Sequence, residues 1–344
     1  MSEIYQPRAL IDAQSSFAVQ PEALAAMVDR LEDQLQKNPI PKPQRIALVG
    51  IGASHAAAGA AAFRLRASGI DAVRFLPSEI PAGLGDPDDV TIYISQSGRS
   101  AEVVEVADRG TGSRFALTNY QPSPLADICS RALNLGDLSD SSVSFVSFTG
   151  TLLALGMLID SWTGRRGSDT WKTLIRSSFA AVEDASSHID RIADLIVSCP
   201  SADFVAPAPM ISVAEEAALM LREGPRIIAT AMETRQYLHG PMDAAKSAAH
   251  VVFGADREAL LVTQLSERTD KLVYITGENG GATNLPAICL RLPVPVADGI
   301  GFSIAATFAM QKLTLSTAKL RGMDINEPAF KRLDTKTDHA MVAR

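Results

Sequence analysis

The stretch IYISQSGRSAEVV (residues 92–104) ends an apolar run in a short cluster of polar residues. Ser95, Ser97 and Ser100 supply hydroxyl groups, and Gly98 permits a tight turn before the helix that Ser100 is expected to begin. Hydroxyls together with the exposed N–H groups of a helix N-terminus can hold a phosphate without a lysine. The stretch therefore predicts a small anion site, although each such serine taken alone could equally be a helix cap.

A second predicted strand ends in a similar turn. In LVGIGASHAAAG (48–59), Gly50, Gly52 and Ser54 lie between a strand and a helix. The spacing does not match the dinucleotide fingerprint, because His55 stands where the third glycine is needed, and no Walker loop follows. Ligands of parallel α/β sheets bind at the carboxyl ends of strands. Two such turns therefore predict a site sized for the monophosphate of a small molecule.

Ionisable side chains gather further along the chain, in EEAALMLREGPRIIATAMETRQYLHGP (215–241). Glu223 falls at the end of a predicted helix, where a carboxylate is unfavourable for the helix dipole. His239 precedes a Gly-Pro pair, which fixes its position as a general acid or base requires. The alternative is a solvated surface glutamate and an ordinary turn histidine. No metal-binding spacing is found among the other histidines, which are His55, His188, His250 and His339.

Strand-like and helix-like stretches alternate in the first half of the chain. A predicted helix over 21–36 and a proline-rich linker over 38–44 come first. Five short apolar runs typical of strands follow, with helical stretches between some of them: RIALVG, AVRFL, VTIYIS, RFALTN and ALNLG. With the helix GTLLALGMLIDSWTG after them, the alternation predicts a parallel sheet covered on both faces.

A second alternation follows a stretch (170–198) that is expected to form one long connecting helix. Its parts are ADFVAPAP, a helix from about 212, HVVFG, KLVYITG, AICLRLP and a last helix through FSIAATFAMQKLTLSTAKLRG. Two similar α/β units in tandem are therefore predicted, with a polar tail that is either disordered or a lid. The expected boundaries are a helical segment 1–40, a first domain 41–168, a connecting helix 169–200 and a second domain 201–344.

Length, charge and cysteine content limit the class of protein. A chain of 344 residues, 47% of them hydrophobic, is long enough for two domains. The net charge of −7 argues against a broad nucleic-acid surface. Cys129, Cys199 and Cys289 lie far apart, and MSEIYQPRAL lacks the features of a signal peptide. We expect a cytoplasmic protein that binds neither nucleic acid nor a membrane.

Six short motifs occur in the order found in the sugar isomerase (SIS) domain family. EIYQPRAL resembles the family's EIYEQP, GIGASHAA its CGTS turn and SQSGRSAE its SQSGET turn. LMLREG and YLHGP resemble LKLKE and LKHGP, and GMDINEP resembles GTDVDQP. The chain thus resembles, over nearly its whole length, the isomerase half of glutamine–fructose-6-phosphate aminotransferases and its stand-alone relatives.

The resemblance implies two tandem doubly wound, flavodoxin-like SIS domains with a C-terminal lid tail, and no metal or organic cofactor. It implies that Glu223 moves a proton between C1 and C2, and that His239 opens the sugar ring from the neighbouring subunit of a homodimer. Lys336 fits the family's tail lysine best, with Lys331 as its rival. The sugar phosphate is expected to contact Gly52, Ala53, Ser54, Ser95, Gln96, Ser97, Ser100 and Ser144.

Three positions depart from the family pattern: Ala53 replaces a threonine, Arg99 a glutamate, and Met220 a lysine one turn before Glu223. The match includes no glutaminase half, so glutamine would serve as nitrogen source only through a separate glutaminase. We expect an aldose–ketose isomerase or deaminase acting on an amino-sugar 6-phosphate. Two alternatives stay open. One is a deglycase, which needs room for an amino-acid moiety, and the other is a non-catalytic phosphosugar sensor.

Overall fold

The computed structural model describes residues 9–83, 89–280, 284–330 and 335–337. Within them lie two five-stranded sheets in which every strand pair is parallel. The first has the order β2-β1-β3-β4-β5, with β1 Arg45–Gly50, β2 Asp71–Phe75, β3 Val90–Ile94, β4 Ser113–Thr118 and β5 Arg131–Asn134. The second has the order β10-β9-β8-β6-β7, with β6 Ser201–Ala206, β7 Ile228–Glu233, β8 Ala249–Phe253, β9 Leu272–Thr276 and β10 Ile288–Arg291.

Numbered within its own half, each sheet has the strand order 2-1-3-4-5, which is that of flavodoxin-like folds. The first half contains the helices α1 Ala13–Ala18, α2 Gln20–Lys37, α3 Ala53–Ala67, α4 Ala101–Arg109, α5 Pro124–Ile128 and α6 Val146–Thr163. The second contains α7 Ser168–Asp184, α8 Ser186–Val197, α9 Ile211–Glu223, α10 Thr234–Leu238, α11 Asp256–Leu265 and α12 Gly299–Leu320. The predicted α/β fold with parallel sheets is confirmed.

Helices pack on both faces of the first sheet. Successive side chains of a strand point to opposite faces, so Leu48 and Val49 of β1 enter different apolar clusters. Leu48 belongs to the cluster that α2, α3 and α6 share, whereas Val49 packs with Val103 of α4 and Leu125 of α5. Helices on both faces explain why the central strand β3 is buried throughout its length.

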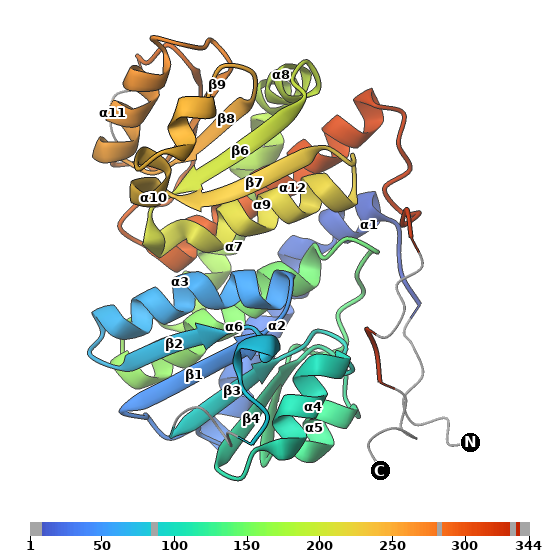
Figure 1. Cartoon of the computed structure of the whole chain (residues 1–344). Coiled ribbons are helices and arrows are strands. Elements are labelled where there is room, and N and C mark those ends of the chain that lie inside the picture. Colours follow the sequence, from blue (N-terminus) through green and yellow to red (C-terminus); the bar gives the residue numbers. More distant parts are fainter. Residues whose placement is uncertain (1–8, 84–88, 281–283, 331–334, 338–344) are drawn as a thin grey trace.

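The two units meet through α3 and α9, which lie against one another between the sheets (Figure 1). Small residues of α3 allow the close approach, since a Cβ added at Gly59 would lie 2.7 Å from the Ile211 side chain. The Ser212 hydroxyl accepts a hydrogen bond from the Ala60 amide at 2.8 Å and donates to the Ala56 carbonyl at 2.6 Å. The alanine-rich composition of α3 is therefore explained by the packing between the two units.

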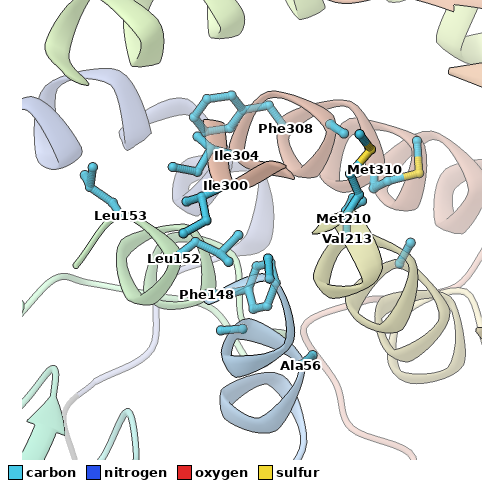
Figure 2. Close-up of a cluster of buried hydrophobic side chains, with 14 of the residues drawn as sticks. Ala56, Phe148, Leu152, Leu153, Met210, Val213, Ile300, Ile304, Phe308 and Met310 are labelled. Carbon is cyan, nitrogen blue, oxygen red and sulfur yellow. The ribbon is translucent and has the colours of Figure 1, made fainter. Parts of the chain in front are cut away.

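One large apolar cluster runs across this junction. Figure 2 shows side chains from α3, α6, α9 and α12 facing one another, among them Ala56, Phe148, Val213 and Ile304. Because both halves contribute to this cluster, the position of each sheet relative to the other is fixed by buried apolar contact. Within the described residues, no helix is long and apolar enough to span a membrane.

The structure differs from the predicted elements in two places. The expected single helix over 170–198 is two helices, α7 and α8, which meet at Ala185. There the Ser186 hydroxyl donates to the Glu183 carbonyl, and such local bonds compete with the helical ladder. Strand β7 was missing from the prediction. It lies at the sheet edge, and Ile228 at its start is 63% exposed, so its apolar pattern is weak.

Candidate functional site

A cavity of about 270 Å³ opens where the strand ends of the first sheet meet the end of α9. The sequence pointed to eleven site residues, and eight of them line this cavity: Gly52, Ala53, Ser54, Gln96, Ser100, Ser144, Glu223 and Lys336. The fold thus brings together residues of both turns, the loop before α6, the end of α9 and the C-terminal tail. Ser95, Ser97 and His239 do not line it.

The turn after β3 is built around Ser95 and Gly98. Ser95 is buried, and its hydroxyl donates to the Ser100 hydroxyl at 3.0 Å. Gly98 has a φ of +61°, and a Cβ there would lie 2.1 Å from the Ser123 hydroxyl, so only glycine fits. Ser95 therefore positions Ser100 through this hydrogen bond and does not itself line the cavity.

The structure does not support the alternative that the side chains of Ser54 and Ser100 only cap helices. Ser100 stands at the cap position of α4, but its side chain makes no capping hydrogen bond. The cap of α3 is Gly52, and Ser54 lies one residue inside the helix. Both hydroxyls line the cavity. They are therefore placed to contact a bound molecule there.

The C-terminal tail lies against the serine turn. The Thr337 amide donates to the Arg99 carbonyl at 2.8 Å, and Lys336 pairs with Ser100 in an antiparallel bridge. The Lys336 ammonium donates to the Ser97 hydroxyl at 3.0 Å. Arg99 donates from Nε to the Thr337 carbonyl at 3.2 Å. This residue therefore helps to hold the tail at the turn.

Lys331, the rival tail lysine, lies outside the described residues. His239 is exposed at the end of α10, and the chain's own cavity does not include it. One chain by itself therefore brings Glu223 and Lys336 together but leaves His239 apart. Among the described residues, no cluster of three histidine, cysteine or acidic side chains could hold a metal ion.

Asp140 is a positioning residue that the sequence reasoning missed. Its buried carboxylate accepts hydrogen bonds from the Ser147 amide at 2.9 Å and the Phe145 amide at 3.1 Å, and from the Ser16 hydroxyl at 2.7 Å. A negative charge is favourable at the N-terminus of α6. The carboxylate thereby fixes the loop that carries Ser144 to the cavity. The signal in the sequence was an aspartate shortly before a serine-rich helix start.

Glu216 is a second residue that the prediction did not single out. It precedes Glu223 by two turns on α9, is 1% exposed, and its Oε2 atom has no hydrogen-bond partner among the described residues. Burial first, and the Glu223 carboxylate second, raise its pKa well above the ordinary 4.5. Met220, one turn from Glu216, brings no charge to compensate. Burial therefore favours the protonated, neutral form of Glu216.

Glu215 precedes Glu216 and lies in a different environment. Its carboxylate accepts two short hydrogen bonds from the Arg74 guanidinium, at 2.5 Å and 2.6 Å. This ion pair joins β2 of the first unit to α9 of the second. The three glutamates of α9 therefore have three different environments. Glu215 links the two units, Glu216 is buried and has a raised pKa, and Glu223 lines the cavity.

Comparison with known proteins gives a consistent result, although no family model matches the chain. The chain is 26% identical over 266 residues to a glutamine–fructose-6-phosphate aminotransferase (isomerizing) of Pseudomonas putida, across 70% of this chain and 43% of that protein. The corresponding protein of Bordetella pertussis is also 26% identical, over 263 residues. The chain spans less than half the length of these curated relatives.

Solved structures share the fold. The C-terminal domain of a glucosamine-fructose-6-phosphate aminotransferase from Francisella tularensis has a TM-score of 0.77 at 18% identity, covering 92% of this chain and 98% of that one. A glucosamine-6-phosphate deaminase from Thermotoga maritima has a TM-score of 0.76 at 20% identity, covering 94% and 99%. A tagatose-6-phosphate ketose/aldose isomerase from Escherichia coli has a TM-score of 0.74 at 15% identity, covering 94% and 97%.

Proposed function

We propose that this chain, which is homologous to the isomerase part of glutamine–fructose-6-phosphate aminotransferase, is an enzyme that isomerises or deaminates an amino-sugar 6-phosphate. The observation that carries the proposal is one cavity lined by the serine turn, by Glu223 and by Lys336. The turn offers neutral donors for a phosphate, and a carboxylate lines the same space.

The chemistry divides among these groups. The phosphate contacts the serine turn and supplies binding energy that orients the reacting carbons. Glu223 takes a proton from one of the two carbons C1 and C2 and returns it to the other. His239 of a second subunit opens the sugar ring, and Lys336 approaches the sugar carbonyl from the tail. The protein then acts as a homodimer, because one chain does not bring its own His239 to the cavity.

Glu223→Gln tests the proposal because it keeps the side chain's shape and removes the base. We expect turnover of glucosamine 6-phosphate or fructose 6-phosphate to fall by about 10²–10⁴-fold while binding persists. Glu102→Gln is the matched control, since Glu102 is another carboxylate that lines the same cavity. Ammonia and ketose products report the reaction. Tight binding with no turnover in the unaltered protein would favour the sensor alternative.

The role of His239 calls for a separate experiment. Glu223→Gln and His239→Asn chains, each inactive alone, are mixed under conditions in which subunits exchange. If each site takes its histidine from the neighbour, hybrids regain part of the activity. Absence of recovery, with exchange verified by a tag, would mean that every site is built within one chain.

A further inference from the structure

A buried network of polar side chains lies next to the segment that carries His239. His250 of β8 and Tyr237 of α10 are both fully buried. The Tyr237 hydroxyl lies 3.0 Å from Nδ1 of His250, and Nε2 of the same ring lies 2.8 Å from the Ala245 carbonyl. Tyr237 precedes His239 by two residues, and Ala245 follows it by six. The imidazole of His250 therefore bonds to the chain on both sides of His239.

The chemistry of these groups fixes the direction of the hydrogen bonds. A carbonyl oxygen can only accept, so Nε2 of His250 carries a proton and donates to Ala245. In the neutral ring Nδ1 is then an acceptor, and the Tyr237 hydroxyl donates to it. In the charged ring Nδ1 donates to the oxygen of the same hydroxyl. Both hydrogen bonds are therefore available in either protonation state of the ring.

The sheet holds the His250 ring in place. Asp203 of β6 is the register partner of His250, and Thr230 of β7 is the register partner of Asp203. The Asp203 carboxylate lies 3.5 Å from Nδ1 of His250 and accepts a hydrogen bond from the Thr230 hydroxyl at 2.5 Å. Burial first, and the charge of Asp203 second, raise the pKa of the Tyr237 hydroxyl above its ordinary value of 10, so this group stays a donor. The network is thus anchored on three adjacent strands, β7, β6 and β8.

The segment between the two anchors combines a supported backbone with an exposed histidine. Leu238 and Met242 pack against the apolar cluster of the second sheet, and a 3₁₀ turn covers Pro241–Ala244. Gly240 has a φ of +134°, which turns the chain sharply after His239. His239 itself is exposed. A catalytic group that serves another subunit needs this combination, because its own chain must hold it while its side chain reaches outward.

We infer that Tyr237 and His250 are positioning residues, which hold His239 in place for the substrate of a neighbouring subunit. The inference rests on the proposed function, because it takes His239 as the residue that opens the sugar ring there. Ring opening then depends on two buried side chains, neither of which lines the cavity. A misplacement of about 1 Å in a catalytic geometry can cost about 100-fold in rate. Loss of one anchor should therefore lower turnover more than binding.

Tyr237→Phe tests this, because it removes one hydroxyl and keeps the shape of the ring. We expect turnover of glucosamine 6-phosphate to fall by about 10- to 100-fold with little change in KM, since the serine turn is unaltered. Tyr274→Phe is the matched control. Tyr274 is fully buried in the same apolar cluster, but its hydroxyl donates to the Gly254 and Ala255 carbonyls in the loop after β8. This variant should turn over substrate like the wild type.

Amide hydrogen exchange measures the anchoring without any reaction. We expect the amides of 239–245 to exchange about tenfold faster in Tyr237→Phe than in the wild type, and Tyr274→Phe to leave them unchanged. His250→Gln should keep more turnover than His250→Leu, because an amide can accept from Tyr237 and donate to Ala245 and leucine can do neither. Wild-type exchange rates in Tyr237→Phe would overturn the inference.

Mixed dimers show whether the effect acts on the donated histidine. In the hybrid of Glu223→Gln and His239→Asn chains, the working site takes His239 from the Glu223→Gln chain. Tyr237→Phe on that chain should lower the recovered activity by about tenfold, but on the His239→Asn chain it should not. Equal losses in both placements would overturn the inference, since a general effect on folding acts from either chain. If the unaltered pair recovers no activity, the shared site of the proposed function fails, and hydrogen exchange still decides whether Tyr237 and His250 hold the segment.

Discussion

Replacing Glu216 by glutamine should make the protein less sensitive to rising pH. Burial raises the pKa of this carboxyl well above 4.5 in the folded chain, whereas the unfolded chain has the ordinary value. Below about pH 4.5 the group is protonated in both states. As the pH rises further, the unfolded chain releases the proton and the folded chain keeps it, so the wild-type free energy of unfolding falls.

The loss of unfolding free energy has an upper limit, which the pH and the ordinary pKa of the unfolded chain set. Each pH unit above the ordinary pKa adds about 1.4 kcal/mol to the cost of holding the proton. Between the ordinary value of 4.5 and pH 7, this gives at most about 3–4 kcal/mol. A loss of that size is a large fraction of the stability of a typical domain. Glutamine has nearly the same shape and stays neutral, so Glu216→Gln should recover most of it at pH 7.

Urea denaturation at several pH values from 4.5 to 7.5 measures this difference. We expect the two proteins to be similar at the acid end and Glu216→Gln to be the more stable at pH 7, with unchanged m-values. Glu105→Gln, an exposed position on α4, is the control and should leave the pH profile as it is. Parallel curves for wild type and Glu216→Gln would refute the reasoning, because they would mean that folding does not change the proton affinity of Glu216.

Four further substitutions probe the serine turn and the tail. Ser100→Ala should weaken phosphosugar binding by about 1–3 kcal/mol in calorimetry, because Ser100 lines the cavity, and equal affinity for the unphosphorylated parent would contradict a phosphate site. Lys336→Ala should abolish turnover with little change in Tm, because its bond to Ser97 is exposed, while Lys331→Ala should be mild. Borohydride trapping with substrate should label Lys336 in the wild type. Gly98→Ala should lower both Tm and the affinity for the phosphosugar, because the added Cβ would clash with the Ser123 side chain. An unchanged Tm would show that the turn can shift to accommodate the methyl group.

The sequence determined the parallel α/β architecture because that information is local. Apolar runs of strand length, separated by helical periods, place β1, β3 and β8 within a residue or so of their observed bounds. The serine turn was equally visible, since Ser95, Gly98 and Ser100 lie within six consecutive residues. Strand β7 was not predicted because its run of residues is only weakly apolar. Such a run forms a strand here because it lies at the edge of the sheet.

Only the tertiary structure decided which groups share a cavity and which charges lose contact with water. Lys336 contacts Ser97 across 239 positions of sequence, a pairing that no local pattern encodes. Glu215 and Glu216 are adjacent and chemically identical in the sequence. Glu215 forms an ion pair and Glu216 is a buried acid with a raised pKa, because successive helix positions point about 100° apart and meet different partners. The environment that sets a pKa is made by packing, and packing is a property of the folded chain.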